Sequence, residues 1–443
     1  MQRLVDRWLI FLNAGLILLG ISLGASGSRR GYFLTLIVLV ALVPMSWARS
    51  RLQAALARAI GPGRRLGVWA AFGILCDLIL VLQLLTGRSP DVFPALHGPG
   101  VVWIGPVWFS AHILLLFGYL LAGLARGVRG LGRRLALRSP GEVAADGLAS
   151  HDRREFLQRM AVAGAAVPFA AAASGVPISY DFRVEEREIV VPGWPRELDG
   201  LRVVHLSDIH VGGGMTRERL HRVAELTNGA RPDLVAHTGD FLTHRRGDFD
   251  LPLYQALARV RAPLGQLACL GNHDYDDPDQ LVRRLGDAGV VVLRNRLTTV
   301  TVAGRPLEIG GTDFMFGTRD RAMRYQQVIG AWRPRARAAR LLLNHDPIAF
   351  PSLPAGAADL VLSGHTHGGH VGVQLGASRA VTVVGLLGLP DQGLFVRGDM
   401  RLFVTRCVGF YGYPMRVGIP PEIAVLTLRT PGSGPERTPP RAI

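Results

Sequence analysis

Four long apolar runs near the start of the chain limit its possible folds more than any other feature. They cover Trp8–Gly24, Gly31–Trp47, Leu66–Leu85 and Val101–Ala125. A helix needs about 17–25 apolar residues to cross a hydrocarbon core of ~30 Å, and each run has roughly that length. Backbone groups in lipid must also be hydrogen-bonded internally, which favours helices. We therefore expect an N-terminal all-α transmembrane bundle of four helices over residues 1–125.

The distribution of arginine predicts how this bundle is oriented. Residues 1–178 hold 18 Arg against 7 acidic residues. The Arg residues gather before the first run, between the second and third runs, and in the linker 126–156. Such basic loops face the cytoplasm. A nucleic-acid-binding protein would instead carry its basic surface on the soluble domain. We expect the lipid bilayer as a partner and no nucleic acid, and the sequence identifies no protein partner.

A fifth, weaker apolar segment covers residues 157–178. The linker before it ends in Asp152-Arg153-Arg154-Glu155-Phe156, which resembles a twin-arginine export signal. Asp152 replaces the usual small hydroxyl residue, and Gln158 replaces the usual Lys. The alternative is a basic flank on a last membrane span. Both interpretations predict a multi-pass protein of the cytoplasmic (inner) membrane in which the residues beyond 178 lie outside the cytoplasm.

Residues 179–430 have the pattern of one α/β domain, in which short apolar runs alternate with stretches of helical length. Buried strands are predicted at Arg202–Leu206, Leu234–Ala236, Gln266–Leu270, Arg340–Leu343 and Leu360–Leu362, with further strands at Val300–Ile309 and Met400–Cys407. Helices are predicted at Arg217–Asn228, Asp250–Val260, Asp279–Ala288 and Arg319–Ala331. The tail 431–443 is rich in Pro, Gly and Ser, so we expect it to be disordered.

Metal-binding types of residue follow five of these strands. The segments are Asp208-Ile209-His210, Gly239-Asp240, Gly271-Asn272-His273-Asp274, Asn344-His345-Asp346 and Gly364-His365-Thr366-His367-Gly368. In open α/β sheets ligands gather at the carboxyl ends of the strands, so the five segments are expected to converge. Each segment alone is weak, because a single Gly-Asp is usually a turn. Together, and in this order, they predict a metal site.

The donor atoms in this set favour two metal ions. Imidazoles, carboxylates and one amide are too many for a single tetrahedral zinc. They suit two divalent cations about 3.5–4 Å apart. The absence of thiolates from the set disfavours an iron–sulfur cluster or a structural zinc site. We expect two divalent metal ions as cofactors, with Mn, Fe or Zn as candidates.

The ordered set of motifs resembles the calcineurin-like metallophosphoesterases over about Leu201–Gly369. The flanking segments Asp199-Gly200-Leu201 and Pro421-Glu422-Ile423 are similar to the membrane-associated or exported bacterial branch, the YkuE-like phosphoesterases. The resemblance implies a four-layer α/β/β/α sandwich over residues 179–430 and a metal-dependent phosphoric ester hydrolase. It implies nothing about the N-terminal runs.

The resemblance also assigns roles to individual residues. Its metal ligands are Asp208, His210, Asp240, Asn272, His345, His365 and His367. It implies that Asp208, His210 and His367 hold one metal and that Asn272, His345 and His365 hold the second. Asp240 would bridge the two. His273 would face the substrate, where it contacts the phosphoryl group or protonates the leaving oxygen. A hydroxide held between the metals would attack phosphorus in line.

Four further residues are interpreted separately from the metal ligands. His370 stands where relatives often have Gln, and is either a donor behind the ligands or a solvated side chain. Cys407 stands where a Gly is common. His205 and His237 lie within predicted strands and are interpreted as core residues.

The leading hypothesis is a membrane-tethered phosphoesterase with a dinuclear metal centre. Its expected substrates are phosphodiesters, or pyrophosphates, of the envelope or linked to lipid. One alternative is a cytoplasm-facing hydrolase that splits a nucleotide-linked acylated sugar in lipid A synthesis, and topology distinguishes the two. A second alternative is a non-catalytic membrane sensor with a metal-binding domain. The complete ligand set argues against this second alternative.

Overall fold

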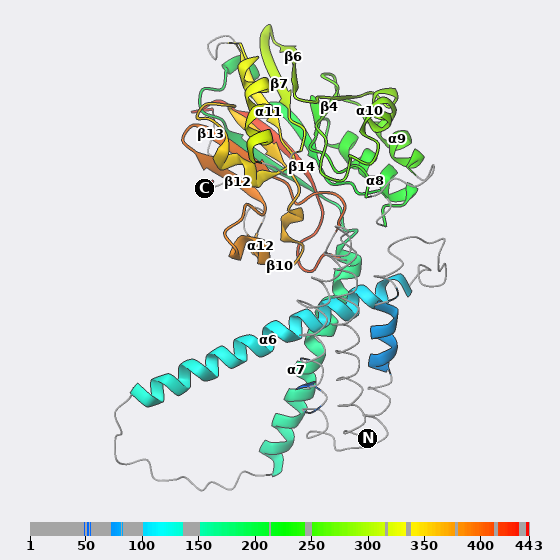
Figure 1. Ribbon diagram of the computed structural model, residues 1–443, viewed down its shortest axis with the longest axis vertical. Helices are drawn as coiled ribbons and strands as arrows, with labels where there is room; N and C mark the ends of the chain where they lie inside the picture. Colours follow the sequence, from blue (N-terminus) through cyan, green and yellow to red (C-terminus); the bar gives the residue numbers. More distant parts are fainter. Residues whose placement is uncertain are drawn as a thin grey trace. The chain divides into compact units, whose positions relative to one another are not determined.

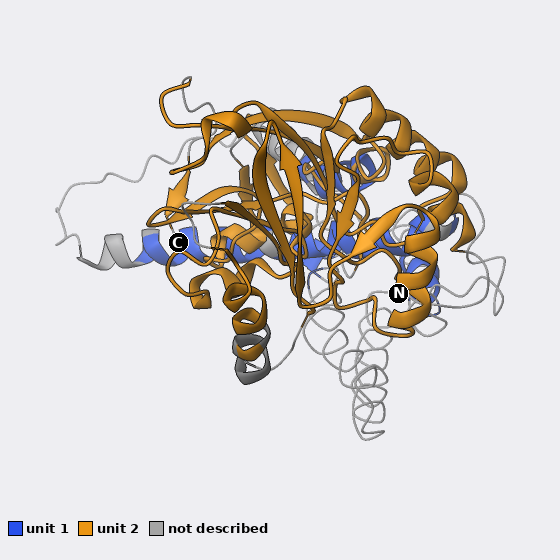
Figure 2. Cartoon of the chain, turned by 90° about the horizontal axis from the view of Figure 1, so that it is seen from above, with its two compact units in different colours: residues 1–174 blue, residues 175–443 orange. Residues whose placement is uncertain are grey.

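The computed structural model describes residues 72–80, 101–135 and 151–442, except 212–213, 244–249, 315–317, 334–337, 377–379, 412–414 and 434–439, together with positions 48, 51, 52, 54 and 82. The chain divides into two compact units, Met1–Ser174 and Gly175–Ile443 (Figure 2). The predicted runs Trp8–Gly24 and Gly31–Trp47 lie outside the described residues.

The described part of the first unit is helical. Helix α6 (Val101–Leu135) contains Trp103–Val128, which is long and apolar enough to cross a membrane. Among the described residues it is the one helix that meets this test. The fourth of the four predicted runs therefore corresponds to a helix long enough to cross a membrane. Residues 72–80 of the third run are also helical. Helix α7 (His151–Ile178) continues from the arginine pair through the fifth apolar segment.

Two large mixed sheets lie at the centre of the second unit (Figure 1). The first has the order β1-β14-β2-β3-β4-β5. Its strands are β1 (Arg183–Val190), β14 (Glu422–Arg429), β2 (Leu201–Leu206), β3 (Leu234–His237), β4 (Gln266–Ala268) and β5 (Val290–Val292). The second sheet has the order β15-β12-β13-β9-β8-β7-β6. Its strands are β15 (Arg441–Ala442), β12 (Gly393–Arg397), β13 (Met400–Val404), β9 (Leu360–Ser363), β8 (Ala339–Leu343), β7 (Arg305–Gly311) and β6 (Arg296–Val302).

Successive side chains of each strand point to opposite faces of its sheet, so each sheet has one face towards the other sheet and one face towards the helices. Side chains at every second position of both sheets, such as Val203 of β2 and Leu341 of β8, pack into one buried core between the sheets. The intervening positions of the first sheet, such as Val204, pack under helices α8 (Arg217–Gly229), α9 (Leu251–Leu257) and α10 (Pro278–Asp287). The outer face of the second sheet packs against helix α11 (Thr318–Gly330) and the short helix η3 (Pro347–Ser352). The result is the expected four-layer α/β/β/α sandwich.

Two predicted elements differ from the structure. The segment predicted as one strand at Val300–Ile309 belongs to the hairpin of β6 and β7, which turns at Ala303-Gly304. Both turn residues have positive φ, 47° and 79°, which a continuous strand does not allow. At the end of the expected disordered tail, Arg441 and Ala442 form β15 and pair with β12.

A buried ion cluster joins β1 to the start of β14, and it gives a pH-dependent prediction. Glu422 accepts hydrogen bonds from Arg187 Nη2 and from the Arg406 backbone, each at 2.9 Å. Burial alone would raise the pKa of Glu422, but Arg406 and Arg187 lower it from 4.5 to about 2. Because the pKa is lower in the folded state, this stabilisation is present above pH 4.5 and is lost as the pH falls towards 2.

Glu422→Gln is expected to destabilise the full chain by about 3–5 kcal/mol at neutral pH, since it removes a buried carboxylate and leaves the buried Arg187 guanidinium facing Glu185, 3.8 Å away. Thermal unfolding of both proteins from pH 7 to pH 2 measures this effect. The difference between them should shrink as the pH falls. A difference that stays constant over this range would contradict the role given to Glu422.

Candidate metal centre

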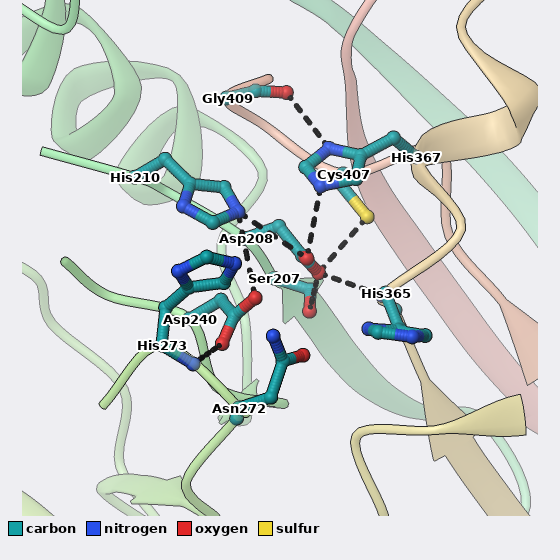
Figure 3. Close-up of polar contacts among 12 residues, drawn as sticks. Ser207, Asp208, His210, Asp240, Asn272, His273, His365, His367, Cys407 and Gly409 are labelled. Carbon is teal, nitrogen blue, oxygen red and sulfur yellow. Dashed lines mark hydrogen bonds and ion pairs between the residues drawn. The ribbon is translucent and has the colours of Figure 1, made fainter. Parts of the chain in front are cut away.

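Strand ends from both sheets bring the predicted ligands together (Figure 3). Parallel strands β2, β3 and β4 end just before Asp208, Asp240 and Asn272. In the second sheet, parallel strands β8 and β9 end just before His345 and His365. The carboxyl ends of both sets face one place, as the sequence predicted.

The first ligand group consists of Asp208, His210 and His367, whose donor atoms lie within 4.8 Å of one another. Asp208 Oδ1 is 3.2 Å from His367 Nε2 and 3.7 Å from His210 Nε2. Asp208 Oδ1 and His210 Nε2 are buried and have no hydrogen-bond partner among the residues that the structure describes. Buried polar atoms are normally paired, so these two atoms fit a divalent cation between them.

The second group consists of Asp240, His345 and His365. His345 Nε2 lies 3.0 Å from His365 Nδ1 and 3.1 Å from Asn272 Oδ1, so the amide joins this group. Asp240 Oδ2 is 3.4 Å from His345 Nε2 and 3.5 Å from His210 Nε2. One carboxylate oxygen therefore lies between the two groups, which is where a bridging ligand must be.

Hydrogen bonds fix which oxygen of Asp208 faces the centre. Its Oδ2 accepts from Ser207 Oγ at 2.5 Å, from His365 N at 2.9 Å and from Cys407 Sγ at 3.1 Å (Figure 3). These three donors occupy Oδ2 and leave Oδ1 for a cation. The sequence did not predict the contributions of Ser207 and Cys407.

The imidazoles are oriented by backbone carbonyls. His345 Nδ1 lies 2.6 Å from the carbonyl oxygen of Thr238, and His367 Nδ1 lies 3.3 Å from that of Gly409. A carbonyl only accepts, so each Nδ1 carries a proton and each Nε2 is free to act as a ligand. This is the arrangement that orients metal-binding histidines.

Five of the seven predicted ligands have left-handed backbone conformations. Their φ values are 53° for Asp208, 52° for His210, 53° for Asp240, 66° for His365 and 51° for His367. Non-glycine residues rarely adopt positive φ, and such strained positions cluster at functional sites. The sharp turns point successive side chains at one centre.

Asp274 holds two of the ligand loops together. Its carboxylate accepts from the backbone N–H groups of Asp240 at 2.7 Å, Phe241 at 2.9 Å and Gly271 at 2.9 Å. Gly239 has φ of 87°, and a Cβ there would lie 2.7 Å from the Gly271 Cα. The loops after β3 and β4 are therefore packed backbone to backbone, which requires glycine.

The centre carries negative charge. Burial alone would raise the pKa of Asp240, but the His345 and His210 imidazoles lower it to about 2. Burial alone would lower the pKa of His345, yet Asp240 and Asp208 raise it to about 10, so a cation that binds Nε2 must displace a proton from it. Burial lowers the pKa of His367 well below its usual value. The two carboxylates thus create a negative potential that attracts cations.

His273 lies beside the two ligand groups and is a member of neither. Its backbone N–H donates to Asp240 Oδ1 at 2.8 Å. Its ring is half-buried, 5.1 Å from the ring of His210 and 4.1 Å from the ring of Tyr411. Tyr411 was not predicted, because it follows β13 in a loop that carries no motif.

A further set of residues supports the ligand loops from behind. His370 is buried and stacks on His367 with ring centroids 4.6 Å apart, so the interpretation of His370 as a solvated side chain is wrong. Arg416 is fully buried and donates to the carbonyls of His367 at 3.0 Å and of Cys407 at 3.1 Å. Arg416 could not be predicted from the sequence, since a single Arg in a loop is normally solvated.

The two strand histidines are core residues. His205 Nε2 lies 2.9 Å from Thr238 Oγ1, and His237 Nε2 lies 3.1 Å from Gln266 Oε1. Burial lowers their pKa values to about 3 and about 4. Both imidazoles are therefore neutral at physiological pH.

Comparisons with known proteins agree with this geometry. The family model described as Calcineurin-like phosphoesterase matches residues 201–369. The chain is 31% identical to the metallophosphoesterase YkuE of Bacillus subtilis, over 53% of this chain and 82% of that protein. It is 28% identical to a transmembrane protein with metallophosphoesterase domain of Danio rerio, over 74% of each chain. It is also 28% identical to the phosphodiesterase YaeI of Escherichia coli, over 51% of this chain and 82% of that protein.

The matched region contains all seven predicted metal ligands, from Asp208 to His367. The chain belongs to the calcineurin-like metallophosphoesterase family and is a metal-dependent phosphoester hydrolase.

Proposed function

We propose that this chain is a membrane-tethered phosphodiesterase with two divalent cations in its active site. The observation that carries the proposal is the position of Asp240 Oδ2, within 3.5 Å of His210 Nε2 and 3.4 Å of His345 Nε2. A carboxylate oxygen shared by two ligand groups is expected where two cations lie about 3.5–4 Å apart. Asp208, His210 and His367 would hold one cation, and Asn272, His345 and His365 would hold the other, with Asp240 shared between them.

The chain's own residues prepare this centre for phosphoester hydrolysis. When bound, divalent cations supply Lewis-acid charge for phosphate oxygens and bring the pKa of water near neutrality. Ser207 and Cys407 hold the Asp208 carboxylate in one orientation. Thr238 and Gly409 fix the tautomers of His345 and His367. No rearrangement of these ligands is then needed during the reaction.

His273 is the residue placed to act on the substrate. Its backbone is anchored on Asp240, while its ring is half-buried at the margin of the centre. An imidazole there contacts the phosphoryl group or, in its protonated form, donates a proton to the leaving oxygen. A diester is favoured over a monoester because one relative with the same domain is named a phosphodiesterase.

The full chain in detergent, supplied with Mn²⁺, provides the test. We expect hydrolysis of an aryl phosphodiester faster than of the corresponding monoester, with loss of activity after chelation and recovery when Mn²⁺ is restored. Faster hydrolysis of the monoester would contradict the phosphodiesterase proposal. A metal-replete protein that cleaves neither would limit the substrate to lipid-linked esters or pyrophosphates.

The membrane tether rests on the first unit. Trp103–Val128 is long and apolar enough to cross a bilayer. The alignment with the transmembrane relative of Danio rerio covers 74% of this chain, whereas residues 175–443 make up about three fifths of it. The similarity therefore extends into the N-terminal unit. We propose a multi-pass protein of the cytoplasmic membrane.

We propose that the catalytic unit lies outside the cytoplasm, where envelope phosphodiesters are its substrates. The alternation of arginine between the loops supports this orientation. A reporter enzyme fused to the C-terminus, of a kind that is active only outside the cytoplasm, should be active in cells. A fusion active only in the cytoplasm would contradict the orientation and favour a cytoplasmic substrate.

A further inference from the structure

Large exposed hydrophobic side chains gather on one hairpin of the catalytic unit. Among the described residues of 175–443, twelve large hydrophobic side chains are exposed, and seven of them lie within 17 consecutive positions. These seven are Val373, Leu375, Val381, Val383, Leu386, Leu387 and Leu389. We call the segment Gly372–Leu389 the apolar hairpin. Single exposed hydrophobic residues are normal, but a contiguous group marks an interaction surface.

The apolar hairpin consists of β10 (Gly372–Gln374), β11 (Ala380–Thr382) and the short helix α12 (Val383–Leu386). Strands β10 and β11 pair with each other in a sheet of their own (Figure 1). Its most exposed side chains are Leu386, at 76%, and Leu387, at 72%. The strands of the hairpin belong to neither large sheet of the sandwich, and its exposed side chains lie in none of the three hydrophobic cores described above.

The composition of the hairpin favours lipid as its partner. Residues 371–390 contain no acidic residue, no aromatic residue and a single Arg. Protein interfaces are enriched in aromatic residues, Met and Arg. The exposed set here is made only of Leu and Val, which suits contact with hydrocarbon chains.

The base of the hairpin is attached to the segment where the unit begins. Val371 forms bridges with Val417 and Gly418. The backbone N–H of Arg416 donates to Ser179 Oγ at 2.9 Å, one residue after helix α7 ends. The last residues of α7, Ala166–Ile178, are themselves apolar. The residues of α7 that belong to the same unit as the hairpin, 175–178, pack against its base, because a Cβ at Gly175 would lie 2.6 Å from the carbonyl oxygen of Arg416.

The hairpin is also tied to the ligand loop. Thr382 at its second strand packs on Gly369, where a Cβ would lie 2.8 Å from the Thr382 Cβ. Thr382 Oγ1 donates to Asp391 Oδ2 at 2.6 Å, and Thr366 Oγ1 donates to the Asp391 carbonyl at 2.8 Å. Thr366 lies between the ligands His365 and His367. Thr382 of the hairpin and Thr366 of the ligand loop thus both bond to Asp391, which connects the hairpin to the metal centre.

We propose that the apolar hairpin inserts its Leu and Val side chains into the lipid–water interface and so presents the metal centre to phosphodiesters carried on lipids. This inference rests on the membrane-tethered phosphodiesterase proposed above. It adds the surface through which the catalytic unit meets the bilayer.

Fluorescence quenching tests the contact. The native cysteines Cys76, Cys269 and Cys407 are buried, so Leu387→Cys offers an accessible thiol for a polarity-sensitive dye. Met323→Cys on α11 is the matched control, because Met323 is 61% exposed. The labelled full chain is reconstituted in vesicles of phosphatidylcholine and phosphatidylglycerol that contain a nitroxide lipid.

We expect strong quenching of the dye at 387 and little at 323. Equal, weak quenching at both positions would overturn the proposal. A dye at 387 that is shielded from water and yet not quenched by the nitroxide lipid would also overturn it, and would show that protein covers the hairpin.

An activity measurement separates this inference from the proposed function. Leu386→Ser combined with Leu387→Ser should lower hydrolysis of a vesicle-borne phosphodiester by at least about tenfold, because interfacial binding depends on buried apolar area. Hydrolysis of the soluble aryl diester should stay unchanged. Equal hydrolysis of the vesicle substrate by both proteins would overturn the hairpin's role. If the parent protein cleaves no phosphodiester, the proposed function fails instead, and the quenching result still decides the hairpin contact.

Discussion

Asp240→Asn is expected to abolish phosphodiester hydrolysis and to leave the protein with fewer than two bound metal ions. Asp240 Oδ2 lies between the two ligand groups, and an amide there cannot share negative charge between two cations. The loss of turnover should exceed the effect of removing a hydrogen-bond partner of a metal ligand, which is about 10–100-fold. Metal content by elemental analysis, together with turnover of the aryl diester at saturating Mn²⁺, measures both effects.

Asp181→Asn is the matched control for this substitution. Asp181 forms an exposed ion pair with Arg183, with both side chains about half exposed. The same chemical change at this site should leave metal content and turnover as in the parent protein. Asp240→Asn with two metals and full turnover would show that Asp240 does not bridge the metals.

His273→Ala should keep both metal ions and lose about 10²–10⁴-fold in turnover, the usual size of a general acid–base contribution. The side chain belongs to neither ligand group, and the contact with Asp240 Oδ1 comes from the backbone N–H, which alanine retains. The measurements are metal content and turnover at saturating substrate.

The leaving group decides which role His273 has. If His273 protonates the leaving oxygen, His273→Ala should impair an alkyl diester far more than an aryl diester, whose leaving group needs less help. Equal losses with both substrates would indicate a contact with the phosphoryl group instead. Full turnover of both diesters by the metal-replete variant would exclude both roles.

The sequence predicted those parts of the fold and the site that depend on local patterns. Strand β2 and the motif Asp208-Ile209-His210 are adjacent in the chain, so an apolar run followed by metal-binding residue types identifies both. The same holds at β3 with Asp240 and at β9 with His365. Parallel strands then bring these ends together without any further information.

The parts that could not be predicted depend on contacts between distant segments. Cys407 donates to Asp208 across 199 positions, and Arg416 supports His367 across 49. Neither residue lies in a motif, and one Cys or Arg in a loop gives no local signal. The hairpin of β6 and β7 was missed for a different reason, because its two-residue turn interrupts a run of strand-forming residues.

Each ligand group combines residues that follow strands of both sheets. Asp208 follows a strand of the six-stranded sheet and His367 follows a strand of the seven-stranded sheet. Asp240 and His345 are divided between the two sheets in the same way. A cation bound by either group therefore cross-links the two halves of the sandwich in the folded state only. Binding of this kind stabilises the folded chain by about 4 kcal/mol when the free cation exceeds its dissociation constant 1,000-fold. Metal binding would therefore raise the free energy of unfolding of the catalytic unit as well as supply its catalytic charge.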